Sequence, residues 1–148
     1  MQRIGIVCGS YHREAVEQML AFAREEAKIL GYSVDWVHWV SGSMEVPLAL
    51  ARMMSEVDGA ACLGIIEKGE TQHGLAMGQA VIKSILELQL QHNKPIGLGI
   101  IANQLTNTCG HMDHDALVPR TGFQQKDLVL GICRQSVGEH AAGTTGAN

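Results

Sequence analysis

Short apolar runs and longer segments with helical periodicity alternate along this chain. The apolar runs predict four β-strands, at residues 3–9, 32–40, 59–66 and 94–101. Apolar residues recur at helical spacing in the other segments, which predicts four α-helices, at residues 11–30, 47–56, 73–92 and 123–137. Gly31 is suited to end the first helix and Pro47 to begin the second.

The order of these elements predicts a single α/β domain. Apolar strands that alternate with helices form a parallel sheet with both faces covered. Right-handed crossovers then produce a doubly wound arrangement. We therefore expect a flavodoxin-like three-layer α/β/α sandwich with a four-stranded parallel sheet, formed by residues 1–140, and a frayed C-terminal tail at residues 141–148.

Polar or glycine-rich loops follow all four predicted strands, at residues 9–12, 41–47, 67–73 and 102–105. Doubly wound sheets bind ligands outside the carboxyl ends of their strands, so a functional site is expected at this edge. The third loop contains Glu70, Thr71 and His73, which place a carboxylate, a hydroxyl and an imidazole at the start of a predicted helix.

The helix predicted at 73–92 has two apolar stripes. One consists of Leu75, Ile82, Ile85 and Leu86, and the other of Met77, Val81 and Leu88. One stripe can cover the sheet, while the second needs another partner. The pattern favours association with a second subunit over complete burial within one thin domain.

The composition narrows the classes of function. Among 148 residues, 11 are basic and 15 acidic, and neither sign is clustered, which argues against a nucleic-acid or membrane-surface partner. We expect neither a transmembrane segment nor a cleavable signal. Cys8 and Cys62 lie in apolar runs, and no two of the four cysteines form a CxxC motif. Buried, reduced thiols and a cytoplasmic location are expected.

Three segments resemble one enzyme family in their order and spacing. They read VSGSMEVPLALARMM at 40–54, GAACLGIIEKGETQHGLAMGQAV at 59–81 and NKPIGLGII at 93–101. The combination of G-S-x-E-[VI]-P with a later G-E-T-x-H is more specific than either motif alone. On these motifs the chain is similar to lumazine synthase, the 6,7-dimethyl-8-ribityllumazine synthase of riboflavin biosynthesis. The resemblance covers residues 3–101 and extends more loosely to RTGF at 120–123.

The resemblance implies a condensation that uses no cofactor and no metal. Its substrates would be 5-amino-6-ribitylaminouracil and 3,4-dihydroxy-2-butanone 4-phosphate, and its products the lumazine, inorganic phosphate and water. The family forms pentamers, paired pentamers or sixty-subunit shells, with active sites between neighbouring subunits. We therefore expect a homo-oligomer, either a pentamer or a multiple of five subunits. The second apolar stripe of the 73–92 helix fits this expectation because it needs a partner.

The resemblance gives His73 the role of the proton-transfer residue. Imidazole can take up and release protons near neutral pH, which suits imine formation and phosphate expulsion. Glu70 and Thr71 match the phosphate-contacting pair, Thr71 through its hydroxyl and Glu70 through its backbone N–H. The alternative is that these residues only cap the helix or face solvent.

Two further segments match the part of the family's site that holds the ribitylaminouracil. Ser43, Met44 and Glu45 match the segment that binds the ribityl chain, although the family usually has an aromatic residue where Met44 stands. Tyr11 takes the place of an aromatic that stacks on the pyrimidine, and its alternative role is to anchor the first helix. His12 follows where asparagine is common.

The later positions depart further from the family pattern. Leu98 and Gly99 replace an aromatic–glycine pair whose backbone contacts the uracil. Arg120 is the candidate for the phosphate-binding arginine, since guanidinium groups suit phosphate. His111 and His114 have a spacing that could hold a metal, but phosphate contact is at least as plausible.

Two other functions stay open at this point. One is a lumazine-synthase-like scaffold with impaired catalysis, which binds flavin-like rings or builds a shell; the altered residues after Asn103 support it. The other is an aminoimidazole ribonucleotide carboxylase-like mutase. The mutase is disfavoured because GSYHRE lacks the Ser-Asp expected after GS, and no SAHR follows the second strand.

Overall fold

The structure, a computed structural model, describes residues 2–67 and 73–103. Its elements are β1 (Arg3–Gly9), α1 (Arg13–Ile29), β2 (Ser33–Val40), the 3₁₀ turn η1 (Ser43–Glu45), α2 (Val46–Met53), β3 (Gly59–Glu67), α3 (His73–His92) and β4 (Ile96–Asn103). All four predicted strands and the first three predicted helices are confirmed. The predicted helix at 123–137 lies outside the described residues.

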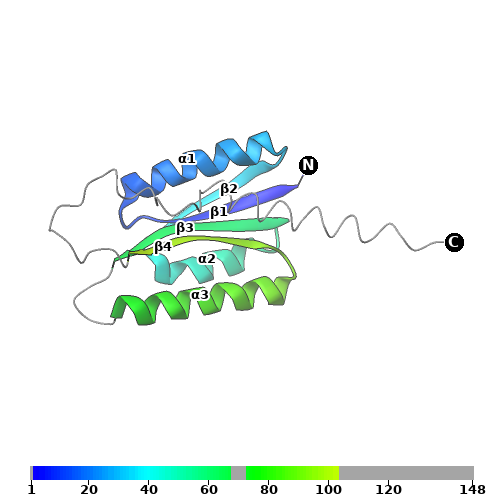
Figure 1. Cartoon of the computed structure of the whole chain (residues 1–148). Helices are drawn as coiled ribbons and strands as arrows, with labels where there is room; N and C mark the ends of the chain where they lie inside the picture. Colours follow the sequence, from blue (N-terminus) through cyan, green and yellow to red (C-terminus); the bar gives the residue numbers. More distant parts are fainter. Residues whose placement is uncertain (1, 68–72, 104–148) are drawn as a thin grey trace.

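The strands form one parallel sheet with the order β2-β1-β3-β4. Helix α1 covers one face, and α2 and α3 cover the other, so the expected three-layer α/β/α sandwich is confirmed (Figure 1). From β1 the chain passes to β2 on one side, whereas from β3 it passes to β4 on the other. The strand order therefore reverses between β1 and β3, which is where such folds open a crevice.

Each face of the sheet carries its own apolar core. Alternation along β1 turns Ile6 and Cys8 toward α1 and Val7 toward α2 and α3, and all three are buried. Gly5 also faces the α2 side, where the Met53 side chain lies so close that a Cβ at Gly5 would be 2.2 Å from its sulfur. The absence of a side chain at Gly5 thus lets α2 pack closely on the sheet.

The ends of the helices follow their local sequence. Gly31 adopts a positive φ of 81°. Its N–H donates to Lys28 O, and the next N–H, of Tyr32, donates to Ala27 O, which is the Schellman arrangement at the end of α1. At the other end, His12 precedes α1 in the left-handed conformation, with φ 54° and ψ 48°. Helix α1 therefore begins two residues later than the sequence pattern predicts.

One of the two apolar stripes predicted on α3 differs from the structure. Val81 and Ile85 are buried together in the core beneath α3, so Ile85 belongs with Val81 and not with Leu75 and Leu86. The second stripe consists of exposed leucines, namely Leu75, Leu86 and Leu90. Grouping Ile85 with Leu86 was wrong because the helical twist turns these adjacent residues toward different surroundings.

Candidate active site

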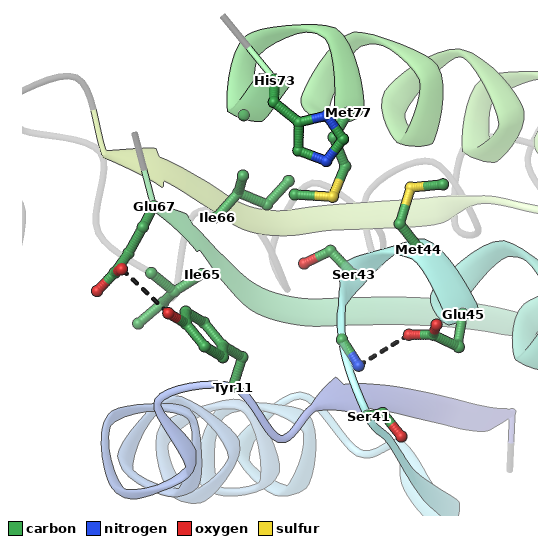
Figure 2. Close-up of a pocket in the computed structure, with 12 residues that line it drawn as sticks. Tyr11, Ser41, Ser43, Met44, Glu45, Ile65, Ile66, Glu67, His73 and Met77 are labelled. Atoms are coloured by element: carbon green, nitrogen blue, oxygen red, sulfur yellow. Dashed lines mark hydrogen bonds between the residues drawn. The ribbon is translucent and has the colours of Figure 1, made fainter. Parts of the chain in front are cut away.

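A cavity of about 530 Å³ opens at the carboxyl edge of the sheet. Its walls come from the segments that follow β1 and β2, from the last residues of β3, and from the first turn of α3 (Figure 2). The lining residues are Tyr11, Ser41, Gly42, Ser43, Met44, Glu45, Ile65, Ile66, Glu67, His73, Gly74 and Met77. The sequence predicts a site at this carboxyl edge, and the structure shows that the cavity also lies at the reversal of strand order.

His73 is the first residue of α3, and its ring points into the cavity (Figure 2). Met77, one turn further along α3, also faces the cavity and supplies an apolar contact beside the imidazole. The first backbone N–H groups of a helix have no partner within the helix, so this end of α3 favours negatively charged groups. An imidazole held there can exchange protons with a bound anion or carbonyl compound.

The η1 turn forms another wall of the cavity, beside α3. Ser43 is buried, and its Oγ lies above Gly64 of β3, where a Cβ would come within 3.2 Å of it. Glu45 folds back, so that its Oε2 accepts a 2.8 Å hydrogen bond from Gly42 N (Figure 2). Met44 stays exposed at the cavity. This turn presents a hydroxyl, a carboxylate and a thioether to the same space.

Tyr11 and Glu67 face each other across the ends of β1 and β3. The Tyr11 hydroxyl donates a 3.1 Å hydrogen bond to Glu67 Oε2 (Figure 2). The other carboxylate oxygen, Oε1, lies 2.5 Å from His12 Nε2. The hydrogen bond to Glu67, reinforced by the carboxylate charge, raises the pKa of the Tyr11 phenol above its ordinary value.

The floor of the cavity is apolar where β3 ends. Ile65 and Ile66 close it from below, beside the polar Glu67. A flat, partly polar molecule would meet an aromatic face at Tyr11, hydrogen-bonding groups at η1 and a proton-exchanging group at His73. The cavity thus has an aromatic ring, hydrogen-bonding groups and an imidazole among its lining residues.

A sequence profile of the 6,7-dimethyl-8-ribityllumazine synthase family matches residues 1–116. The chain belongs to this family. Among similar proteins, the 6,7-dimethyl-8-ribityllumazine synthase of Staphylothermus marinus is 36% identical over 103 residues, which are 68% of this chain and 69% of that protein. The synthase of Picrophilus torridus is 36% identical over 102 residues, covering 68% and 75% of the two chains. That of Methanosarcina mazei is 31% identical over 110 residues, covering 73% and 82%.

The residues expected to bind the ribitylaminouracil in this lumazine synthase family member do not all meet in one cavity. Tyr11 and the three residues of η1 line it together with His73. Leu98 lies opposite Cys62 within the sheet and packs against the core on the α2 and α3 face, while Gly99 lies opposite Leu63. Among the predicted site residues that the structure describes, Leu98 and Gly99 are the two that do not line the cavity.

Several of the expected positions lie outside the described residues. They are Glu70 and Thr71 of the loop before α3, Arg120, and the His111 and His114 pair. Within residues 2–67 and 73–103, no three His, Cys, Asp or Glu side chains gather in a way that could hold a metal. In the same residues, no helix has the length and apolar character needed to cross a membrane.

The sequence analysis did not single out several lining residues. They are Ser41, Gly42, Ile65, Ile66, Glu67, Gly74 and Met77. Glu67 carried a usable signal, because it is a charged residue directly after the buried run of β3, within a loop assigned to the site edge. Ile65 and Ile66 carried none, since apolar residues at a strand end also fit a core position.

Proposed function

We propose that this protein is a 6,7-dimethyl-8-ribityllumazine synthase. It condenses 5-amino-6-ribitylaminouracil with 3,4-dihydroxy-2-butanone 4-phosphate in riboflavin biosynthesis, without a cofactor. The observation that carries the proposal is the position of His73, which faces a cavity shared with Tyr11 and the η1 turn at the reversal of strand order. Family membership supplies the substrate class.

His73 is the proton-transfer residue in this proposal. The substrate amine attacks the ketone to form an imine with loss of water, the phosphate then leaves, and the ribitylamino nitrogen closes the second ring with loss of a second water. Each step moves a proton to or from nitrogen or oxygen, which imidazole can do near neutral pH. The N-terminus of α3 favours the departing phosphate because the positive end of the helix dipole lies there. We assign Glu70, Thr71 and Arg120 to the same phosphate.

The other walls of the cavity hold the ribitylaminouracil. Tyr11 stacks on the pyrimidine, since more than half of its surface is exposed at the cavity. Ser43 and Glu45, with the backbone of Met44, provide hydrogen-bonding groups for the ribityl hydroxyls.

The protein works as a homo-oligomer built from pentamers. The exposed leucines of α3 supply an apolar surface for a neighbouring subunit. Leu98 and Gly99 contribute to substrate binding through their backbone, and a site shared between subunits is compatible with their distance from this cavity. We place the activity in the cytoplasm, where the buried free thiols of Cys8 and Cys62 are in keeping with a reducing compartment.

The test is an assay with both substrates that follows lumazine absorbance and fluorescence. We expect wild type to exceed the spontaneous reaction, and His73→Ala to lower kcat about 100-fold or more. The matched control is His92→Ala at the opposite end of the same helix, which should retain wild-type rates. If wild type forms lumazine no faster than the background but binds riboflavin, the protein is a scaffold that has lost catalysis.

A further inference from the structure

Glu67 contacts Tyr11 and His12, the two residues between Ser10 and the start of α1. Its Oε2 accepts the hydrogen bond from the Tyr11 hydroxyl, at 3.1 Å, and its Oε1 lies 2.5 Å from His12 Nε2. The Tyr11 and His12 rings meet edge to face, with centroids 4.7 Å apart and planes at 77°. One carboxylate therefore joins the end of β3 to the start of α1.

The backbone explains how this contact forms. Alternation along β3 turns Ile65 and Glu67 toward the α1 face of the sheet, so the carboxylate emerges beside the β1–α1 connection. His12 adopts the left-handed conformation, which is unfavourable for a residue with a Cβ. Such strain persists where the surrounding contacts hold the residue in place, and it is frequent at ligand-binding sites.

The contact restricts the Tyr11 ring. Tyr11 is 53% exposed, so packing against neighbouring residues restricts its side chain little. Anchoring the hydroxyl to Glu67 fixes the far end of the side chain, while the backbone fixes the near end. A ring that is already held in its binding orientation loses less entropy when a ligand stacks on it.

We propose that Glu67 is a positioning residue, which fixes the Tyr11 ring as a wall of the cavity for a planar heteroaromatic ligand, while His12 orients the carboxylate. The inference rests on the proposed function, in which Tyr11 stacks on the pyrimidine. Although Glu67 lines the cavity, its proposed role is to act through Tyr11. Its effect is on affinity for the pyrimidine and not on proton transfer or phosphate binding.

The decisive experiment is a double-variant cycle with Glu67→Leu, Tyr11→Phe and the combination. The binding probe is the 5-nitro analogue of the ribitylaminouracil, whose nitro group cannot condense with the ketone, so turnover is not needed. We expect Glu67→Leu to weaken binding of this analogue in calorimetry about 3- to 10-fold. Tyr11→Phe keeps the ring but loses the anchor, and the combined variant should bind no more weakly than Glu67→Leu alone. Glu67→Gln, which retains an acceptor for the phenol, should recover part of the loss.

A spectroscopic readout shows whether the anchor exists in solution. In a Tyr32→Phe background Tyr11 is the chain's single tyrosine, so phenolate absorbance follows it alone. Removing Glu67 should lower the Tyr11 pKa toward its ordinary value. The matched control is Glu87→Gln, an exposed carboxylate on α3, which should change neither the titration nor the affinity.

Three results would overturn the inference. They are an unchanged Tyr11 titration in Glu67→Leu, unchanged affinity for the analogue in that variant, and losses that add fully in the combined variant, since additivity would mean that Glu67 acts independently of Tyr11. A failure of the proposed function would give a different result from a failure of this inference. In that case wild type makes no lumazine, while the binding cycle still reports on Glu67 because the analogue requires no catalysis.

Discussion

Ser43 of η1 rests on Gly64 of β3, so closely that a methyl group at Gly64 would lie 3.2 Å from the Ser43 hydroxyl oxygen. Such a separation is tighter than an ordinary van der Waals contact, and Ser43 is buried, with little room to yield. The position of η1, which forms one wall of the cavity, therefore depends on the absence of a side chain at Gly64.

Replacing Gly64 should impair binding more than folding. We expect Gly64→Ala to displace η1, to raise the KM for the ribitylaminouracil several-fold, and to destabilise the fold by about 1 kcal/mol. The matched control is Gly78→Ala on α3, where a Cβ would meet Ile66 at an ordinary 3.8 Å. Because alanine favours the helix interior, that variant should gain up to about 1 kcal/mol. Steady-state kinetics and urea unfolding check both, and wild-type KM in Gly64→Ala would contradict the explanation.

Gly5 should be sensitive for a different reason. A methyl group there would lie 2.2 Å from the Met53 sulfur, so Gly5→Ala should force the Met53 side chain to move and destabilise the protein by about 1–3 kcal/mol. Urea unfolding measures the loss. Shortening the opposing residue should restore part of it, so Gly5→Ala combined with Met53→Val should be more stable than the sum of the single effects predicts. Simple additivity would rule out this steric account.

Alkaline pH should destabilise the protein through its buried thiols. Burial raises the pKa of Cys62 from 9.0 to about 12, and that of Cys8 to about 11. Below pH 9 the thiols are protonated in both the folded and unfolded states, so nothing is lost. Above pH 9 the unfolded state releases these protons first, and stability falls until the folded pKa is reached.

Cys62→Ala isolates this effect. Between pH 9 and pH 10 the contribution of Cys62 amounts to roughly 1 kcal/mol, since one unit of pKa corresponds to 1.36 kcal/mol. The variant should be less stable than wild type at pH 7, because it loses packing and the contact of Sγ with Gly97 O. Its free energy of unfolding should nevertheless fall less steeply above pH 9. Equal slopes in urea unfolding at pH 8, 9 and 10 would contradict the argument.

The exposed stripe of α3 should control assembly. We expect Leu86→Glu to place a charge where a neighbouring subunit packs and to shift sedimentation from a multimer of five toward smaller species. The matched control is Ile29→Glu at the end of α1, which is equally apolar and more exposed. A wild-type protein that sediments as a monomer would remove the basis for this prediction.

The sequence predicted the elements well because their signals are local. Apolar runs and helical spacing are properties of neighbouring residues, and the parallel order follows from alternation of strands and helices. Whether a side chain is buried depends on residues that are distant in the sequence. Leu86 and Ile85 are adjacent in sequence, yet only the packing of α3 against β4 and α2 decides which is buried.

The same limit applies to the site. His73, Tyr11 and the η1 residues were predicted from motifs that coincide with loop positions, and they line one cavity. The position of Glu67 in a loop assigned to the site edge was a usable signal, but its hydrogen bond to Tyr11, 56 positions earlier in the chain, has no local pattern that predicts it. Leu98 and Gly99 were predicted from resemblance alone, and within this chain their positions are set by pairing with β3.

Because His12 has a left-handed backbone, replacements that raise thermal stability at this position conflict with ligand binding. Glycine or asparagine at this position would relieve the steric conflict of the Cβ, so a search for thermostable variants should converge on them. Either replacement would remove the imidazole that lies against Glu67. A replacement of His12 that raises thermal stability should therefore lower the affinity of the cavity for an aromatic ligand.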